Sequence, residues 1–170
     1  MHFKYLPSFV KRRGRITKKQ IENIEDLHKF SVSNFNDIKN ISEDFTSTTI
    51  EIGFGDGENI FSIAKGNPET LFVGSEVYLS GIGSLIGKIK ENNLLNIRIH
   101  NGDVRELLET IKAPIFKSML IICPDPWPKL KHHKRRMLNR EFLELIHPII
   151  KENGNLFMST DWENYAESIG

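Results

Sequence analysis

From residue 48 onward, apolar and polar positions follow two alternating patterns. Short β-branched and apolar runs ending near glycine or aspartate are typical of buried strands, and apolar residues spaced three or four apart are typical of helices. The pattern predicts strands at 48–55, 71–77, 96–103, 117–125 and 155–161, and helices at 58–66, 80–93, 104–112, 135–151 and 161–170. Regular alternation of strands and helices predicts an α/β domain with a parallel, doubly wound sheet.

The segment before residue 48 has a different character. Residues 1–20 read as an irregular basic arm, and residues 21–47 are polar with scattered aromatic residues, which favours a short helix or an ordered lead-in. We therefore divide the chain into an arm and lead-in at 1–47 and an α/β domain at 48–170. A length of 170 residues with 39% hydrophobic content suits one globular core.

Charge changes this picture because it is unevenly distributed. The net charge is only +1, yet thirteen of the 23 basic residues lie in 1–20 and 126–140, two segments without any acid. A basic arm and a basic loop on an acidic body indicate a site for a polyanion such as nucleic acid. Two solvated surface runs are the alternative.

Other features limit the class of protein. The single cysteine, Cys123, excludes a disulfide framework and a CxxC metal site, and it suits a reducing compartment. The apolar runs are far shorter than the ~20 residues of a membrane helix, and the N-terminus lacks an apolar signal segment. We therefore expect a cytoplasmic protein.

An acidic residue lies at the end of each predicted strand. These residues are Glu51, Glu76, Asp103, Asp125 and Asp161. In open parallel sheets, ligands bind beyond the carboxyl ends of the strands, where the strand order reverses. We therefore expect the five acids to converge on one rim.

The turn after the first strand carries three glycines at alternate positions, Gly53, Gly55 and Gly57. Glycine permits positive φ and close approach of a ligand to the backbone. The GxG pattern also occurs in dinucleotide-binding folds. Two details favour S-adenosylmethionine over NAD: Glu51 suits a cationic aminoacyl group, and GxGxG replaces the GxGxxG that presents a helix N-terminus to phosphate.

Two further acids suit the remainder of this cofactor. Glu76 follows Glu51 by 25 residues, and a carboxylate there can accept both ribose hydroxyls. Its alternative is a solvent-facing loop acid. Asp103 can accept from the adenine amino group, cap the following helix, or do both.

The fourth strand ends in a loop that combines a rigid acid, an aromatic ring and cations. Prolines on both sides restrict the backbone of Asp125, and Trp127 offers a surface for base stacking. The basic run KLKHHKRR follows and suits phosphate contacts. The alternative is a rigid turn before a solvated helix start. His132 and His133 are adjacent and have no second ligand cluster, so we expect no metal site.

At this point the sequence closely resembles the tRNA (guanine-N7-)-methyltransferase family. The matching motifs are SFVKRRGRITKKQ, EIGFGDGE, VGSEV, NIRIHNGD, PDPWPKLKHHKRR and STDWENYA, in the family's order. The resemblance implies a Rossmann-like class I methyltransferase sheet, S-adenosylmethionine as cofactor, and methylation of guanine N7 in the tRNA variable loop. It implies no metal.

The resemblance also implies roles for individual residues. Glu51, Glu76, Asp103 and Asp125 match the family's cofactor-site acids, and Asp125 also matches its presumed catalytic residue. Lys129 and Asp161 match substrate-contacting positions. An RNA-contacting segment is matched by Lys131, His132, His133, Lys134, Arg135 and Arg136.

The match departs from the family in three places. Tyr78 and Ser80 stand where the family often has His and Pro. Family members also continue with a closing β-hairpin that carries a Thr-x-x-Glu motif, which we expect this sheet to lack. The hypotheses are therefore an active enzyme, a non-catalytic RNA- or cofactor-binding remnant, and an NAD-type oxidoreductase, for which the sequence has no GxGxxG. A monomer and a homodimer both remain open.

Overall fold

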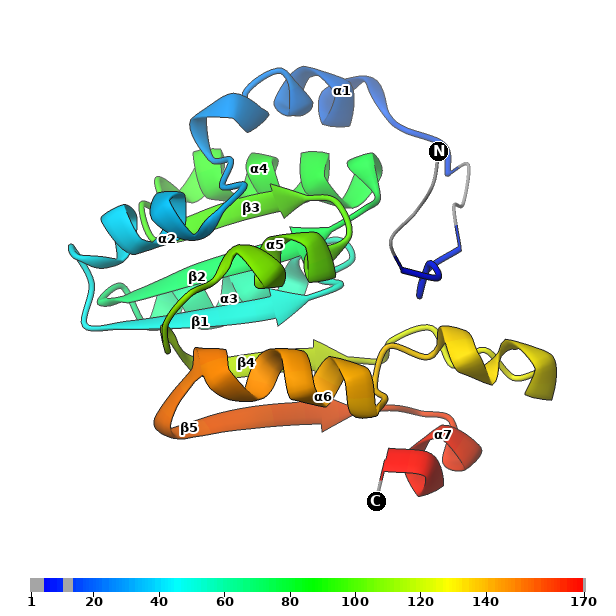
Figure 1. Cartoon of the computed structure of the whole chain (residues 1–170). Coiled ribbons are helices and arrows are strands. Elements are labelled where there is room, and N and C mark those ends of the chain that lie inside the picture. The colour runs from blue at the N-terminus through cyan, green and yellow to red at the C-terminus, as the bar shows by residue number, and fades with distance from the viewer. Residues whose placement is uncertain (1–4, 11–13, 170) are drawn as a thin grey trace.

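The computed structural model describes residues 5–10 and 14–169. Its centre is a five-stranded, fully parallel sheet, which confirms the predicted fold class (Figure 1). The strands are β1 (Ser47–Ile52), β2 (Thr70–Glu76), β3 (Ile97–Asn101), β4 (Phe116–Ile122) and β5 (Ile150–Ser159), in the spatial order β3-β2-β1-β4-β5.

The strand order reverses between β1 and β4. Strands β2 and β3 are added on one side of β1, whereas β4 and β5 are added on the other. Near its end β1 pairs with both neighbours, since Ile52 lies opposite Ser75 of β2 and Ile121 of β4. The carboxyl ends of the strands therefore meet at one edge, where such sheets bind their ligands.

Helices cover both faces of the sheet (Figure 1). The helices are α1 (Lys18–Ile24), α2 (Phe35–Ser42), α3 (Glu58–Gly66), α4 (Leu79–Asn92), α5 (Val104–Thr110), α6 (Arg140–Ile146) and α7 (Glu163–Ile169), with short 3-10 turns η1 (Leu27–Lys29), η2 (Leu130–Arg135) and η3 (His147–Ile149). Side chains from α2, α5, α6 and α7 form one core, which includes Ile50 and Tyr165. Side chains from α3 and α4 form the other, which includes Ile60 and Ile86.

The segment before β1 is more ordered than the sequence predicted. Helix α1 begins at Lys18, inside the arm predicted to be irregular, because Thr17 and Gln20 form a capping box that satisfies two exposed backbone donors. Helix α2 begins after Asn34, whose side chain accepts from the Asp37 N–H, and Ile38 is fully buried in the core.

The predicted helix at 135–151 is wrong at both ends. Helix α6 starts only after Asn139, whose side chain caps it by accepting from the Phe142 N–H. It ends at the η3 turn, where Pro148 lacks the N–H that would continue an α-helix. Strand β5 then begins at Ile150, five residues earlier than predicted, with a register irregularity opposite Phe116 and Ser118.

No helix within the described residues is long and apolar enough to cross a lipid bilayer.

Candidate active site

A cleft of about 480 Å³ opens at the carboxyl ends of the strands. Its volume lies within the range of small-molecule sites. Its walls come from the glycine turn, the ends of β2 and β3, the start of α4, the loop after β4 and the N-terminal arm. The lining includes Ser8, Phe9, Gly53, Gly55, Glu76, Tyr78, Gly81, Asp103, Cys123 and Asp125. The cleft thus brings together five predicted positions that follow or end four different strands. These are Gly53 and Gly55 after β1, Glu76 at the end of β2, Asp103 after β3 and Asp125 after β4.

The three glycines of the turn have different surroundings. Gly53 and Gly55 have φ of 72° and 60°, and a Cβ added to either would meet nothing within 4 Å. They therefore leave the backbone open to a ligand. Gly57 has φ of 81°, but a Cβ there would lie 2.8 Å from the Leu85 side chain, and Gly57 is the N-cap of α3. Gly57 is not part of the cleft lining, so its predicted cofactor contact stays a prediction.

Glu76 is the acid most firmly built into the cleft wall. Its carboxylate accepts the backbone N–H groups of Gly55 at 2.8 Å, Val77 at 2.7 Å and Tyr78 at 3.1 Å. Burial raises the pKa of Glu76, and the charge of Asp125 raises it further, whereas the three N–H donors lower it. Glu76 thereby ties the end of β2 to the glycine turn.

Glu51 lies at the end of β1 but outside the cleft lining. The side chain is 2% exposed, and its carboxylate accepts from the Asn59 amide at 2.9 Å. Burial raises the pKa of Glu51, and the Asn59 hydrogen bond opposes this shift. A buried carboxylate held by one neutral amide gains from a nearby cation.

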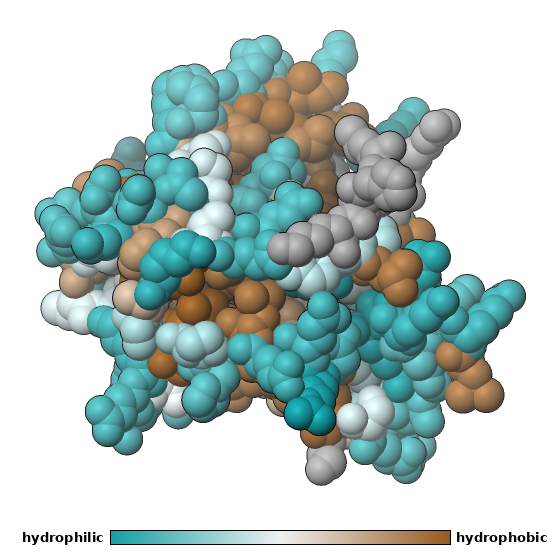
Figure 2. Space-filling model, in the orientation of Figure 1, coloured by the Kyte–Doolittle hydropathy of each residue, from teal (hydrophilic) through white to brown (hydrophobic). Residues whose placement is uncertain are grey.

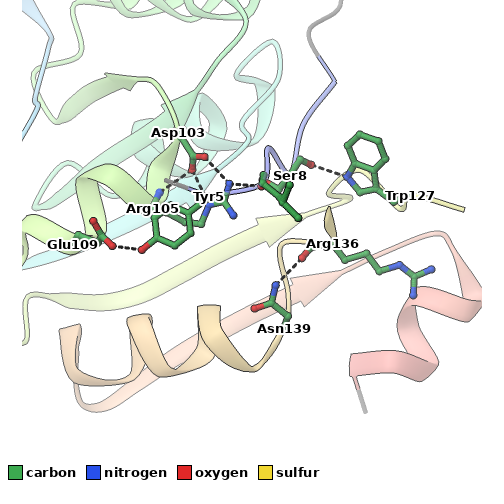
Figure 3. A network of polar contacts seen from close by, with 9 residues as sticks. Tyr5, Ser8, Asp103, Arg105, Glu109, Trp127, Arg136 and Asn139 are labelled. Atoms are coloured by element: carbon green, nitrogen blue, oxygen red, sulfur yellow. Dashed lines mark hydrogen bonds and ion pairs between the residues drawn. The ribbon is translucent and has the colours of Figure 1, made fainter. Parts of the chain in front are cut away.

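Asp103 has the capping role that the sequence predicted. Its carboxylate accepts from the Arg105 backbone N–H at 3.1 Å at the start of α5. The same carboxylate pairs with the Arg105 guanidinium, at 3.0 Å from Nε and 2.6 Å from Nη2 (Figure 3). Asp103 also lines the cleft, and its contact with adenine stays a prediction.

Residues 5–10 of the N-terminal arm lie against the cleft, with Ser8 and Phe9 in its lining, and contact several of its other walls. Arg105 stacks on the Tyr5 ring at 4.6 Å and donates to the Leu6 carbonyl at 2.9 Å (Figure 3). Trp127 Nε1 donates to the Ser8 carbonyl at 2.9 Å, and the Val10 N–H donates to Asp125 Oδ2 at 3.2 Å. The arm therefore lies against the site. Positions 4 and 11–13, which are four of the seven basic positions in residues 1–20, fall outside the described residues.

The loop after β4 is a strained segment held by neighbouring elements. Cys123 and Trp127 have φ of 47° and 44°, which costs a non-glycine residue on the order of 1–3 kcal/mol. The Cys123 N–H donates to the Ser159 carbonyl at the end of β5, at 2.9 Å. The half-buried Asp125 follows two residues later and faces the cleft. The bond from Cys123 to β5 before Asp125, and the bond from the Trp127 indole to Ser8 after it, thus restrain the loop on both sides of Asp125.

The predicted RNA-contacting residues divide into two groups. Lys131 and Lys134 are exposed on η2, as is Lys129 just before it, and Figure 2 shows this region, at the right of the view, as a largely hydrophilic projection. Arg135 lies 5.0 Å over the Trp127 ring, and His132 meets that ring edge-on at 5.7 Å. Desolvation and the surrounding cations lower the pKa of His132.

The second group points into the protein. His133 Nε2 is buried and has no hydrogen-bond partner among the described residues. Arg136 is 5% exposed, and its guanidinium contacts protein groups. RNA contacts by His133 and Arg136 stay predictions.

Asp161 lies on the loop between β5 and α7. The backbone hydrogen bond between Cys123 and Ser159 joins the ends of β4 and β5, and Asp125 and Asp161 each follow that bond by two residues. Asp161 is exposed, and neither it nor Lys129 is part of the cleft lining. Their substrate contacts stay predictions.

The sequence did not predict three residues of the site. Gly81 of α4 packs directly against the glycine turn, since a Cβ there would lie 2.9 Å from the Gly55 carbonyl carbon and closer to its oxygen. Arg105 binds both Asp103 and the arm, and Ser8 lines the cleft. The spacing Gly81, Gly83, Gly87 within a helix was the one available signal of close packing.

Among the described residues, 5–10 and 14–169, no group of three or more His, Cys, Asp or Glu side chains lies close enough to hold a metal ion.

Solved structures support the fold. The 16S rRNA methyltransferase KamB superposes with a TM-score of 0.59 at 14% identity, over 93% of this chain and 65% of that one. A 30S ribosomal A1408 methyltransferase from an uncultured bacterium gives 0.58 at 24% identity, over 76% and 62%. At these identities the likeness concerns the fold alone.

Sequence comparisons identify the family. Residues 46–170 match the family described as "Putative methyltransferase". The tRNA (guanine-N(7)-)-methyltransferase of Nitrosococcus oceani is 38% identical over 169 residues, which is 96% of this chain and 72% of that protein. The enzyme of the same name from Legionella pneumophila strain Corby is 35% identical over 96% of this chain and 76% of that protein. This chain belongs to the tRNA (guanine-N(7)-)-methyltransferase family.

Proposed function

We propose that this protein transfers a methyl group from S-adenosylmethionine to N7 of a guanine in the variable loop of tRNA. The observation that carries the proposal is the convergence of Glu76, Asp103 and Asp125 with an open glycine turn on one cleft. This convergence occurs in a member of a family whose named relatives are tRNA (guanine-N(7)-)-methyltransferases.

The chemistry of the cleft suits the cofactor. Gly53 and Gly55 leave their backbone accessible, and Glu76 and Asp103 supply carboxylates for the ribose hydroxyls and the adenine amino group. Glu51 is a buried carboxylate with a raised pKa, so a cationic ligand nearby would offset its desolvation. When bound, S-adenosylmethionine supplies an electrophilic methyl group on a positively charged sulfur.

The reacting base requires positioning more than proton transfer. Guanine N7 carries a free lone pair, so no proton has to leave before it attacks. We assign Asp125 or Asp161 as the acceptor of the guanine N1–H and exocyclic amine, which orients the ring and enriches N7 in electron density. Correct placement of N7 beside the methyl group is the main contribution, and nearby carboxylates stabilise the cationic purine product.

The surface beside the cleft suits the RNA backbone. Lys129, Lys131 and Lys134 are exposed there, and Arg135 lies against Trp127. Lysine and arginine side chains neutralise phosphates and fix the orientation of the nucleic acid. We further propose a cytoplasmic location, which suits a tRNA substrate and the single exposed Cys123.

The proposal is tested with a tRNA transcript and methyl-labelled S-adenosylmethionine. A second transcript carries 7-deazaguanosine in place of guanosine, which keeps base pairing but removes the N7 lone pair. We expect label in the first transcript and none in the second. Equal labelling of both would overturn the assignment of N7. Tight cofactor and tRNA binding without labelling of either would indicate the non-catalytic remnant.

A further inference from the structure

Arg136 differs from the other cations of the loop that follows β4. It is 5% exposed, whereas the neighbouring Lys134 is exposed to solvent. Its guanidinium makes three hydrogen bonds within the protein. Nε donates to the Pro126 carbonyl at 2.9 Å, Nη2 to Asn164 Oδ1 at 2.8 Å, and Nη1 to Ser168 Oγ at 3.2 Å. All three nitrogens of the guanidinium thus have partners inside the fold.

The two ends of this network belong to different elements. Pro126 lies in the loop after β4, whereas Asn164 and Ser168 lie on α7. Figure 3 shows the Arg136 side chain extending from its own backbone toward that helix, while Asn139 binds its carbonyl. Arg136 therefore bridges the loop that carries Asp125 and the helix that begins two residues after Asp161.

Tyr165 of α7 forms the base on which Arg136 lies. The guanidinium is 4.7 Å from the Tyr165 ring centre, and Tyr165 is fully buried. The Tyr165 hydroxyl also accepts the Leu138 N–H at 3.1 Å. One aromatic side chain thereby anchors the segment on both sides of Met137, so the position of the guanidinium is fixed by the core.

Arg136 binds the carbonyl of Pro126, the residue between Asp125 and Trp127. Since Trp127 has φ of 44°, its backbone needs an external restraint to keep this conformation. A hydrogen bond from a charged, buried donor to the preceding carbonyl supplies that restraint. The restraint acts on the direction in which Asp125 and Trp127 project.

We propose that Arg136 is a positioning residue that clamps the Asp125 loop to α7, and so fixes Asp125 relative to Asp161, rather than a phosphate contact. The proposal rests on the function proposed above, because it concerns the two acids assigned to the guanine. A lysine keeps the charge but presents one nitrogen in place of a planar, three-nitrogen group. Arg136→Lys therefore separates the clamp from the charge.

The kinetic test compares Arg136→Lys with Lys134→Ala, which removes a charge from the exposed side of the same loop. We expect Arg136→Lys to lower kcat by about tenfold or more, as small misplacements of catalytic groups do, with the KM for tRNA within about twofold and its salt dependence unchanged. Lys134→Ala should instead raise KM, flatten the salt dependence and spare kcat. A Lys134-like pattern for Arg136→Lys, or wild-type kinetics, would overturn the proposal.

A partner variant covers the case in which Arg136→Lys is poorly folded. Asn164→Ala removes one hydrogen bond to the guanidinium from an exposed position. It should lower kcat in the same way but to a smaller extent, and the double variant should be no worse than Arg136→Lys alone. Independent, additive losses would show that the two residues do not act together.

A fluorescence readout separates the clamp from the reaction. The chain has two tryptophans, so Trp162→Phe leaves Trp127 as the sole reporter of the loop. In that background Arg136→Lys should increase acrylamide quenching of Trp127, and Lys134→Ala should not. Unchanged quenching contradicts the clamp whether or not the protein methylates tRNA. An inactive wild-type protein whose Trp127 responds as expected would contradict the proposed function and retain the clamp.

Discussion

Replacement of Gly81 by alanine tests how the cofactor cleft is built. Gly81 lies in the first turn of α4, directly beneath the glycine turn. The added methyl group would lie 2.9 Å from the Gly55 carbonyl carbon and closer to its oxygen, which is backbone and has no rotamer to change. The turn must retreat by about 1 Å to restore ordinary packing. The same movement pulls on Glu76, which accepts the Gly55 N–H.

This displacement has a cost in stability and a cost in binding. Overpacking of a closely packed site destabilises by roughly 1–3 kcal/mol, partly offset by the ~1 kcal/mol that alanine gains over glycine within a helix. In a domain of this size each ~1 kcal/mol lowers Tm by about 2–4 °C. Because the moved turn is the proposed cofactor contact, we expect the affinity for S-adenosylhomocysteine to fall by on the order of 10²-fold.

Isothermal calorimetry and thermal unfolding provide the assay, with Gly66→Ala as the matched control. Gly66 ends helix α3, and a Cβ added there meets nothing within 4 Å. The control should bind S-adenosylhomocysteine as the wild type does. Wild-type affinity in Gly81→Ala would show that the glycine turn does not form the cofactor contact.

Three further predictions concern the acids and the basic loop. Asp125→Ala should lower the rate of methyl transfer by about 10²-fold or more while tRNA affinity in a filter-binding assay changes little; substantial turnover would argue against its role. Lys131→Ala with Lys134→Ala should weaken tRNA binding and reduce the slope of log affinity against log salt by about 1 for each phosphate that is no longer neutralised, and an unchanged slope would mean that both lysines are merely solvated. Burial raises the pKa of Glu51 above 4.5, so its ionised form destabilises the fold above the raised pKa and this penalty disappears below pH ~4.5. Glu51→Gln should therefore raise Tm at pH 7 but not at pH 4, while weakening cofactor binding; an equal gain at both pH values would contradict the titration of Glu51.

The sequence predicted the sheet well because its strands have a strong local signal. The β-branched and apolar run before Gly53 and the continuous apolar run before Cys123 need no tertiary information to be read as buried strands. The helix predicted at 135–151 is longer than α6 because the apolar spacing of a helix continues through Asn139 and Pro148. The Asn139 side chain caps the start of α6, and the missing N–H of Pro148 ends it. The spacing of apolar residues therefore predicts that a helix exists, whereas local hydrogen bonding sets the residues at which it begins and ends.

The site was predicted less completely than the sheet. Glu76, Asp103 and Asp125 line one cleft, as expected for residues at the ends of parallel strands, whereas Glu51 and Asp161 do not line it. Which glycine faces the ligand could not be predicted, since Gly55 is open and Gly57 packs on Leu85 only through the arrangement of α4. A run of cations likewise does not reveal that Arg136 is buried against α7. Its partners there, Asn164 and Ser168, lie 28 and 32 positions further along the chain.

We propose that this cleft directs the methyl group to guanine N7 of tRNA. The most direct measurement is mass spectrometry of the nucleosides from an unmodified tRNA transcript incubated with the 170-residue chain and S-adenosylmethionine. We expect 7-methylguanosine to form in proportion to the amount of enzyme and to be absent when the cofactor is omitted. Methylation of a different base or position, or no methylation by a protein that binds both cofactor and tRNA, would contradict it.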